Sequence, residues 1–161
     1  MWATAKGLRR IEFGPLPKDS HVDSPESRPA LLHSAVTELE EYFSRRRRTF
    51  DLDLDLEAAT DFQREVYRHL GGVGYGHVTT YGHLAEEIGR PELARAVGQA
   101  VGANPIPIVI PCHRVIAAES KLGGFSGGLE AKVALLRLEG VDVDGPDPNG
   151  QVRPEVIPLD L

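Results

Sequence analysis

The chain has 161 residues, of which 41% are hydrophobic and 26% are charged. This size and composition suit one domain or two small packed lobes, and they exclude wholesale disorder, collagen-like repeats and coiled coil. The longest strongly apolar stretch, Pro105–Pro111, is far shorter than the roughly 20 residues of a membrane helix. Cys112 is the only cysteine, which rules out an internal disulfide and a multi-cysteine zinc site. Because no secretory signal pattern opens the chain, we expect a cytoplasmic protein with no membrane partner, metal or other cofactor.

The net charge of −6 is spread unevenly along the chain. Residues 1–59 carry a net charge of −2, residues 60–140 are neutral, and residues 141–161 carry −4. Total charge bears on solubility and steering, and it does not describe one face of a molecule. The charge distribution therefore permits binding to DNA without suggesting it.

The first part of the chain predicts a hairpin, a loop and a helix. Residues 2–5 and 8–13 flank Lys6-Gly7, which is typical of a β-hairpin. Residues 14–29 are rich in Pro, Ser and Asp and indicate a loop. Apolar side chains recur every three or four residues from 32 to 43, which predicts an amphipathic helix. The side chains expected on its buried face are Leu32, Val36, Leu39 and Phe43.

Two charged patterns follow this helix. The run Arg45–Arg48 favours a solvated helix end near the negative pole of the helix dipole, with phosphate contacts as the less favoured interpretation. From 50 to 56, Phe or Leu alternates with Asp. This period of two predicts a half-buried strand whose outer face is acidic, in preference to a metal site.

The second half of the chain predicts four helices. Thr60 and Gln63 form a capping box at the start of the first. Thr80 can cap a short helix that Gly89 ends, and Pro91 opens another over 92–101. Two short helices joined by a tight turn favour a helix-turn-helix, whose small-sided second helix either packs tightly or lets a partner approach. The last helix has Leu129, Val133 and Leu136 on its inward face and Gly140 beyond its end.

Cys112 follows the stiff run 105–111, which predicts a buried extended segment or edge strand. A cysteine attacks as its thiolate, and a neighbouring imidazole such as His113 can take the proton. Adjacent side chains of an extended chain point apart, so this pairing needs a turn or a bridging water. A lone cysteine is more often an inert core residue, and residue types alone leave both roles open.

The string from Asn104 to Ile116 closely resembles the active-site signature of O6-alkylguanine-DNA alkyltransferases, also called methylated-DNA–protein-cysteine methyltransferases. The likeness spans Thr60–Gly140 and extends more loosely to the helix and strand before it. Other matching motifs are Tyr75-Gly76, Thr80-Tyr81-Gly82, Ala94–Gly98, Leu122–Gly128, Lys132, Leu135-Leu136 and Glu139. The resemblance implies an α+β fold with a ribonuclease-H-like N-terminal lobe, 1–58, and a winged-helix-like lobe with the helix-turn-helix, 59–145. Residues 146–161 are expected to form an irregular tail.

The resemblance also implies a mechanism, in which an alkyl group moves from O6-alkylguanine, and from O4-alkylthymine, to an ionised Cys112. Glu139 would orient His113, which takes the cysteine proton through a water. Asn104 would tie the helix-turn-helix to the active-site segment, and Tyr81 would press on the DNA backbone and polarise the guanine. The partner would be duplex DNA containing alkylated guanine, bound in the minor groove by a monomer, with cooperative binding left open.

The family pattern assigns further residues to the flipped base and its pocket. Arg95 would fill the stack that the base leaves, a substitution that offsets part of the cost of flipping. The other DNA contacts implied are Thr80, Ala94, Ala96 and Gly98, and the lesion pocket implied is Val115, Gly124, Phe125 and Ser126.

The sequence departs from the family in several places. Phe125 stands where tyrosine is usual, which removes a hydroxyl donor worth about 0.5–1.5 kcal/mol. Gly74 replaces a common proline, Thr80 a serine, and Ser120 a frequent glycine. The chain also begins where family members already have a preceding strand, so either the N-terminal lobe lacks its first strand or the start is misassigned.

Three other functions stay open at this point. An alkyltransferase-like protein, which recruits repair factors without chemistry, would lack the nucleophile, so Cys112 argues against it. A transcription regulator would need to read bases, and a recognition helix of Ala, Gly and Val offers few groups for this. A cysteine hydrolase would turn over a small ester or peptide, and no motif in the chain supports it.

Overall fold

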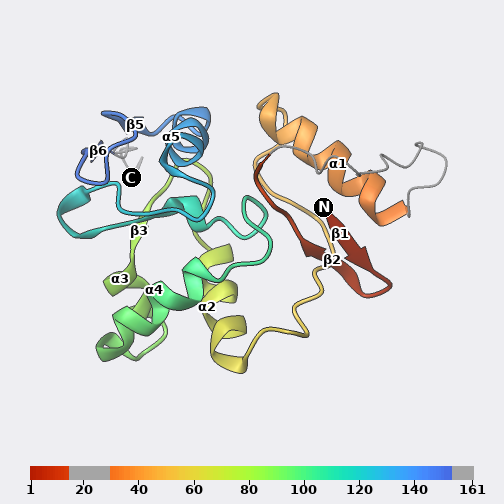
Figure 1. Cartoon of the computed structure of the whole chain (residues 1–161), viewed down its shortest axis with the longest axis horizontal. Coiled ribbons are helices and arrows are strands. Elements are labelled where there is room, and N and C mark those ends of the chain that lie inside the picture. The colour runs from red at the N-terminus through yellow and green to blue at the C-terminus, as the bar shows by residue number, and fades with distance from the viewer. Residues whose placement is uncertain (15–29, 154–161) are drawn as a thin grey trace, which may run out of the picture.

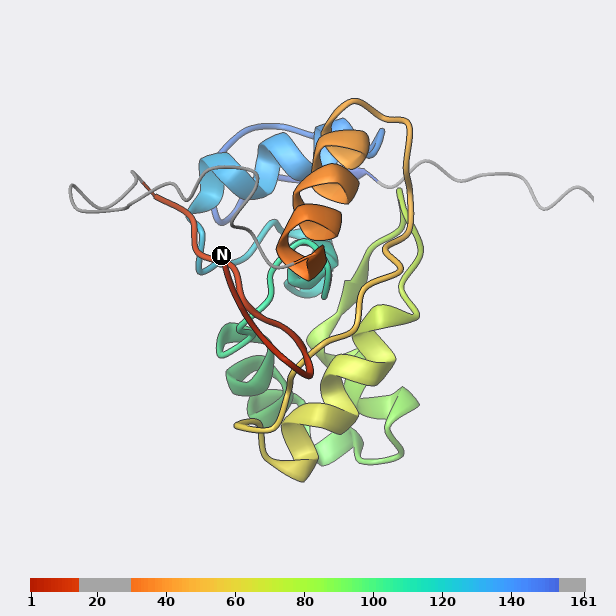
Figure 2. The same ribbon diagram turned by 90° about the vertical axis from the view of Figure 1, so that its right-hand side faces the viewer.

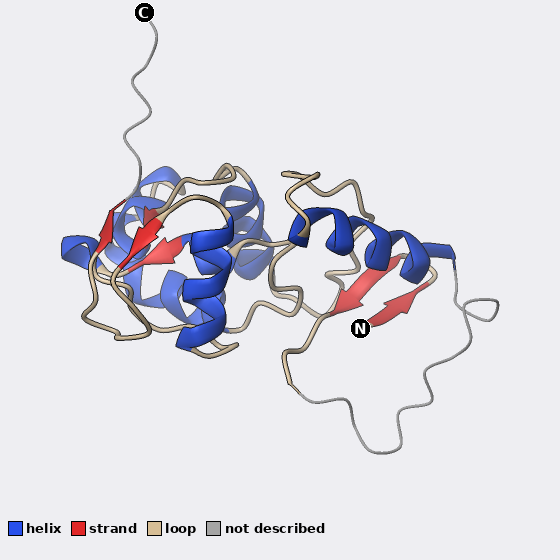
Figure 3. Ribbon diagram, turned by 90° about the horizontal axis from the view of Figure 1, so that it is seen from above, coloured by secondary structure: helices blue, strands red, loops and turns tan. Residues whose placement is uncertain are grey.

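The computed structural model describes residues 1–14 and 30–153. Figure 1 shows a small N-terminal lobe, in which helix α1 lies against a β-hairpin, beside a larger lobe of helices and short strands. Seen from above in Figure 3, the two lobes lie next to each other along the long axis of the molecule. The loop expected over 14–29 lies, from residue 15 on, outside the described residues.

The predicted hairpin is confirmed. Strands β1 (Trp2–Thr4) and β2 (Gly7–Arg10) pair antiparallel. Gly7 has a φ of 154°, and a Cβ atom at this position would lie 2.4 Å from the carbonyl oxygen of Asp53. Only glycine lets the hairpin approach the later segment so closely.

The strand predicted over 50–56 is wrong except at one position. Leu8 and Leu54 form an isolated parallel bridge, in which the Leu8 N–H donates to the Asp53 carbonyl at 2.7 Å. The alternation of side chains breaks at Asp55, which is buried and accepts a hydrogen bond from Thr4 Oγ1 at 2.7 Å. The outer face is therefore less acidic than the pattern indicated, because one aspartate fastens the hairpin.

Helix α1 (Ala30–Phe43) confirms the predicted helix, but its buried face is rotated from the predicted one. Ala35, Leu39 and Tyr42 are buried, whereas Phe43 is 51% exposed. Alanine and tyrosine also recur at a helical spacing here, and a pattern restricted to large aliphatic side chains and phenylalanine overlooks them.

The helical core of the second lobe agrees with its sequence signals (Figure 2). Thr60 and Gln63 form the predicted capping box, and Thr80 Oγ1 accepts the N–H of His83 as a cap. The two short helices pack together as a helix-turn-helix, with a 3-10 turn at Pro91–Leu93 leading into the second. The four helices are α2 (Asp61–Gly71), α3 (Tyr81–Glu87), α4 (Ala94–Gly102) and α5 (Leu129–Leu138).

Two small sheets complete this lobe. Strands β3 (Thr79–Thr80) and β4 (Val115–Ile116) pair in parallel, which joins the start of the helix-turn-helix to the segment after Cys112. Strands β5 (Asp142–Val143) and β6 (Val152–Arg153) pair antiparallel. The tail expected from 146 onward is therefore not wholly irregular, because β6 docks against β5 and buries Val152.

The prediction for 105–111 is right about burial, since Ile106, Ile108 and Ile110 are buried, but wrong about an extended segment or edge strand. The chain folds back on itself there, with the Ile110 N–H donating to the Ile106 carbonyl at 2.9 Å. Ile108 takes a φ of 75°, a left-handed conformation that is uncommon for a β-branched residue. Proline restricts a turn as well as a strand, so the run of prolines did not distinguish the two. Within the described ranges, no helix is long and apolar enough to cross a membrane.

Candidate active site

Cys112 lies at the start of a 3-10 turn, Cys112–Arg114, and only 4% of its surface is exposed. Its N–H donates to the Ile110 carbonyl at 2.8 Å. Pairing of adjacent side chains needs either a turn or a bridging water, and the structure has a turn here, in which consecutive residues no longer point to opposite sides. The cysteine is therefore presented by a compact turn that the folded-back loop before it supports.

Asn104 closes that loop with its side chain. Its Nδ2 donates to the Ile110 carbonyl at 2.8 Å, and its Oδ1 accepts the Ile106 N–H at 3.0 Å. Because Asn104 comes just after α4, these two hydrogen bonds fasten the end of the helix-turn-helix to the segment that carries Cys112. Both polar atoms are buried, so the two bonds fix the loop without competition from water.

His113 is fully buried, and its Nε2 lies 2.8 Å from Glu139 Oε1. Its Nδ1 is also buried and has no hydrogen-bond partner among the described residues. Burial lowers the pKa of His113 below its ordinary value, although the hydrogen bond and charge of Glu139 oppose this. The imidazole is therefore neutral at rest and can accept a proton.

Glu139 is the hub of the buried polar network. Burial opposes its ionisation, but hydrogen bonds from His113 and Arg114 outweigh burial and lower its pKa to about 2. The Arg114 guanidinium binds both carboxylate oxygens, at 2.9 and 2.8 Å. Sequence reasoning gave no role to Arg114 or to the two other donors to this carboxylate, the Tyr42 hydroxyl at 2.6 Å and the Gly76 N–H at 3.2 Å.

The resting state of Cys112 differs from the expectation of an ionised sulfur. Burial raises the pKa of the Cys112 thiol, although a hydrogen bond from Asn104 and the charge of Lys132 oppose this. Burial therefore favours the neutral form of both Cys112 and His113.

A pocket of about 230 Å³ opens onto Cys112. This is smaller than the roughly 300–1,000 Å³ of pockets for drug-sized ligands, so it suits one small ring system. Its lining residues are Tyr81, Val101, Gly102, Cys112, Gly124, Phe125 and Ser126, which include five predicted site residues. Val115 does not line it, because its side chain is fully buried in the core.

Lys132 on α5 holds the loop that forms one wall of this pocket. It is fully buried, and its ammonium donates to three backbone carbonyls, those of Val115 at 2.7 Å, Leu122 at 2.6 Å and Gly124 at 2.9 Å. Burial lowers the pKa of Lys132 to about 8. In the sequence, Lys132 stands next to Val133 on the inward face of the last helix. This position is the signal that could have indicated a buried lysine.

Phe13, which follows the hairpin of the N-terminal lobe, packs against the same wall. Its ring meets that of Phe125 edge to face, with centroids 5.6 Å apart. Both rings lie over Gly127, where a Cβ atom would come within 2.6 Å of Phe13 and 2.7 Å of Phe125. The absence of a side chain at Gly127 therefore allows the two lobes to meet at the pocket wall.

The helix-turn-helix places its predicted contacts on different faces. Arg95 on α4 is exposed, and its neighbours Ala94 and Ala96 are half-buried. Gly98 faces inward, since a Cβ atom there would lie 3.6 Å from the ring of Tyr81. Gly98 therefore lies against Tyr81 at an ordinary contact distance, and the freely exposed member of this group is Arg95.

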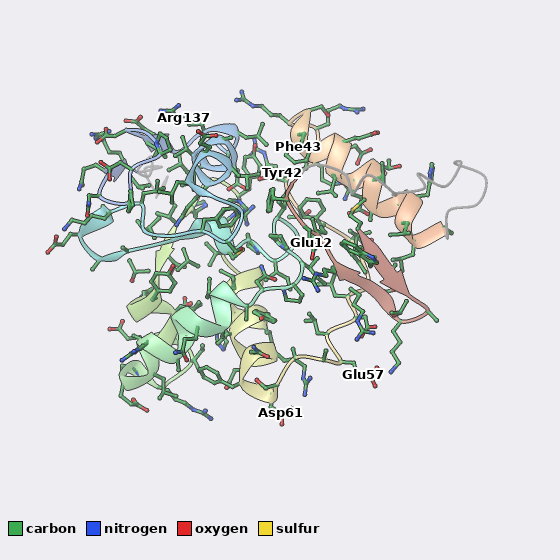
Figure 4. The ribbon with its side chains drawn as sticks, viewed as in Figure 1. Glu12, Tyr42, Phe43, Glu57, Asp61 and Arg137 are labelled. Carbon is green, nitrogen blue, oxygen red and sulfur yellow. The ribbon has the colours of Figure 1, made fainter. Side chains whose placement is uncertain are left out.

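No described part of the molecule forms a candidate metal site. Among residues 1–14 and 30–153, no group of three or more His, Cys, Asp or Glu side chains is placed to hold a metal ion. Figure 4 shows the side chains of both lobes meeting where α1 approaches the C-terminal elements, with Tyr42 at this junction.

Two family models match the chain over nearly its whole described length. Residues 61–141 match "6-O-methylguanine DNA methyltransferase, DNA binding domain", and residues 2–56 match the ribonuclease-like domain of the same family. The chain belongs to the 6-O-methylguanine DNA methyltransferase family. The two matched ranges correspond to the two lobes, which have the architecture of this family.

Curated relatives of the methyltransferase family carry the name methylated-DNA–protein-cysteine methyltransferase. One from Mycobacterium tuberculosis is 49% identical over 132 residues, which cover 82% of this chain and 78% of the relative. One from Methanosarcina acetivorans is 43% identical over 135 residues, 84% of this chain and 81% of the relative.

Solved structures of methyltransferase relatives have the same fold. The Mycobacterium tuberculosis OGT in complex with DNA is 48% identical, with a TM-score of 0.66 over 70% of this chain and 69% of that chain. A Pyrococcus kodakaraensis O6-methylguanine-DNA methyltransferase is 37% identical, with a TM-score of 0.56 over 73% of this chain and 68% of that chain.

Proposed function

We propose that this protein repairs alkylated DNA by transferring the alkyl group from O6 of guanine to the sulfur of Cys112. The observation that carries the proposal is a cysteine that lines a small pocket and is followed, in the same 3-10 turn, by an imidazole that Glu139 holds at 2.8 Å. The family of the chain and the DNA-bound structure of a close relative support it. O4-alkylthymine in DNA is proposed as a second substrate of the same pocket.

The transfer begins with the cysteine proton. It moves from the sulfur to the imidazole of His113 through a water at Nδ1, and the Glu139 carboxylate stabilises the cation that forms. The thiolate then attacks the alkyl carbon, a carbon–sulfur bond forms, and the bond between that carbon and O6 breaks. The electron pair leaves with guanine, which the hydroxyl of Tyr81 stabilises. Burial raises the pKa of Tyr81, so this hydroxyl keeps its proton and acts as a donor.

The product is a thioether on Cys112. A thioether sulfur is a poor leaving group, and none of the proposed steps regenerates the thiol. Each protein molecule is therefore consumed by one lesion. A single-turnover methyltransferase of this kind needs no cofactor, because the substrate itself supplies the group that is transferred.

We propose that α4 enters the minor groove of duplex DNA and that Arg95 occupies the stack left by the flipped base. Flipping costs a few kcal/mol, which an inserted side chain can partly offset. Thr80, Ala94 and Ala96 are proposed as contacts to the DNA backbone, and Gly98 lies against the ring of Tyr81. The wall formed by Gly124, Phe125 and Ser126 contacts the lesion.

Further features of the proposal concern organisation and location. The two domains are the lobes 1–58 and 59 onward, and the second includes β6, because Val152 packs in its core. The protein acts as a monomer on its lesion, and cooperative binding of several copies to DNA is part of the proposal to be tested. We place it in the cytoplasm because the sulfur must stay reduced to act, and cytosolic thiols are kept reduced.

One experiment tests the proposal against its rivals. The protein is incubated with a duplex oligonucleotide containing O6-methylguanine, digested, and the Cys112 peptide is weighed. We expect one added methyl group per molecule, and none in Cys112→Ala. Tight binding of the lesion without a gain in mass would overturn the proposal in favour of a recruiting protein. Repeated turnover of an ester substrate would overturn it in favour of a hydrolase.

A further inference from the structure

Tyr42 connects the N-terminal lobe to the candidate catalytic network. It lies near the end of α1, has no exposed surface, and donates its hydroxyl to Glu139 Oε1 at 2.6 Å, across 97 positions of sequence. The same oxygen accepts His113 Nε2 and Arg114 Nη2, each at 2.8 Å. Figure 4 shows Tyr42 on the side of α1 that faces the C-terminal lobe. The carboxylate that orients the imidazole is thus shared between the two lobes.

The position of this hydroxyl is fixed by packing. The ring of Tyr42 has three aromatic neighbours, Phe43 and Phe50 with centroids at 5.4 Å and Tyr75 at 6.0 Å. The contacts with Phe43 and Tyr75 are edge to face, a favoured arrangement of aromatic rings. Because the ring is held on several sides, the hydroxyl reaches Oε1 in one fixed geometry without selecting among rotamers.

The hydroxyl of Tyr42 acts as a donor alone. Burial raises its pKa far above the ordinary value, and the charge of Glu139 raises it further. The phenol therefore keeps its proton throughout the reaction. Tyr42 does not touch the substrate pocket, so its influence has to pass through the carboxylate.

We propose that Tyr42 is a positioning residue for cysteine activation, whose hydroxyl fixes Oε1 of Glu139 and competes with His113 for it. This inference rests on the proposed function. With three donors on one oxygen, each receives only part of its negative charge. Without the hydroxyl, more of that charge faces the imidazole, and the protonated form of His113 is favoured. The titratable and charged groups around this pair are Tyr42 of α1, Cys112 and Arg114 of the turn, Tyr75 of the loop after α2, and Lys132 of α5.

The test is the variant Tyr42→Phe, which removes one oxygen and keeps the packed ring. The transfer rate from O6-methylguanine duplex is followed through the pH range in which histidine titrates. Transfer needs a neutral His113, so a raised pKa moves the acid limb of the profile to higher pH. We expect a shift of about half a unit to one unit, the size of effect of one hydrogen bond, and no loss of rate above the acid limb, because a more basic His113 takes the cysteine proton more readily.

Tyr75→Phe is the matched control. It removes a hydroxyl from the same aromatic cluster, but that hydroxyl donates to the uncharged Leu138 carbonyl at 2.9 Å. We expect its acid limb to coincide with that of the wild type. If Tyr42→Phe lowered the rate equally at every pH, or left the profile unchanged, the inference would be overturned.

A second measurement separates this inference from the proposed function. NMR titration of isotope-labelled histidine reports the pKa of His113 without any transfer taking place. We expect a higher pKa in Tyr42→Phe than in the wild type, and equal values would overturn the inference. Failure of the wild type to acquire a methyl group on Cys112 would instead overturn the proposed function, whatever the titration shows.

Discussion

The two lobes contribute to the candidate site in different ways. The C-terminal lobe supplies Cys112, His113 and Glu139 from one stretch of fewer than thirty residues, and its buried hydrogen bonds fix their geometry. The N-terminal lobe supplies single side chains, Tyr42 and Phe13, that reach across to support a carboxylate and a pocket wall. The proposed reacting groups thus lie in one local stretch of sequence. The supporting groups come from distant positions that no sequence motif marks.

If the buried network of the C-terminal lobe contributes most to stability and to methyl transfer, Glu139→Gln reduces both more than any other variant does. It leaves the nearly buried guanidinium of Arg114 without a counter-charge, which costs about 3–5 kcal/mol. We expect a loss of this size in chemical unfolding, together with a large loss of methyl transfer. Glu57→Gln in the N-terminal lobe is the control, because it breaks an exposed ion pair with Lys6 and should cost below about 1 kcal/mol. Equal losses would remove the distinction between the lobes.

The pH dependence of stability tests the same buried network around Glu139. The folded pKa of Glu139, about 2, lies below its unfolded value of 4.5. Its contribution to stability is therefore complete above about pH 4.5 and is lost as the pH falls toward about 2. Unfolding measured through this window should show a shallower loss in Glu139→Gln than in the wild type. Parallel curves would show that other carboxylates govern acid unfolding.

Lys132→Met tests the second anchor of the C-terminal lobe. It removes the donor to three carbonyls around the pocket, and we expect a loss of about 2–4 kcal/mol in thermal or chemical unfolding. Slower transfer should accompany it, because the wall at Gly124 is released. Lys121→Met is the control, since that lysine pairs with an exposed glutamate and should cost below about 1 kcal/mol. A loss below this value at Lys132 would show that the loop holds its own shape.

The sequence predicted best those elements that local interactions decide. The capping box of Thr60 and the cap of Thr80 satisfy backbone groups within their own helices, so these signals hold whatever the rest of the chain does.

The pairing of His113 with Glu139 could be predicted only through a family resemblance. A spacing of 26 residues says nothing about contact until the turn at Cys112 and the end of α5 are placed.

The sequence predicted poorly those elements that tertiary contacts decide. The segment 50–56 has the period of a strand, but it pairs only where Gly7 lets the hairpin approach. The run 105–111 is apolar throughout, and the buried side chain of Asn104 is what folds it back. Tyr42 carried no signal at all, because its partner is 97 positions away.

Arg95→Ala separates binding from chemistry within the C-terminal lobe. Its exposed side chain is proposed to replace the flipped base, so its loss should slow repair of duplex O6-methylguanine about 10- to 100-fold, equivalent to about 1.4–2.8 kcal/mol. Alkylation by free O6-benzylguanine needs no flipping and should change little. Arg90→Ala, an exposed arginine before α4, is the control and should leave both rates near the wild type. Equal losses with both substrates would place Arg95 in the chemistry or in folding.

Phe13→Ala is expected to have the smallest effect, because it removes a support of the wall and no reacting group. Phe13 is 39% exposed, and an edge-to-face pair adds about 0.5–1.5 kcal/mol beyond its buried area. We expect a loss of stability near this range and a drop in duplex repair of less than about tenfold, since Phe125 loses its neighbour across the lobe boundary.

Phe13→Leu keeps an apolar side chain over Gly127 without an aromatic edge, and it should recover part of the rate lost in Phe13→Ala. Recovery would show that filling the space above the wall matters more than ring geometry, since a leucine restores packing and not the aromatic pair. An unchanged rate in Phe13→Ala would mean that Lys132 alone holds the wall. The N-terminal lobe would then act on the site through Tyr42 and not through the pocket.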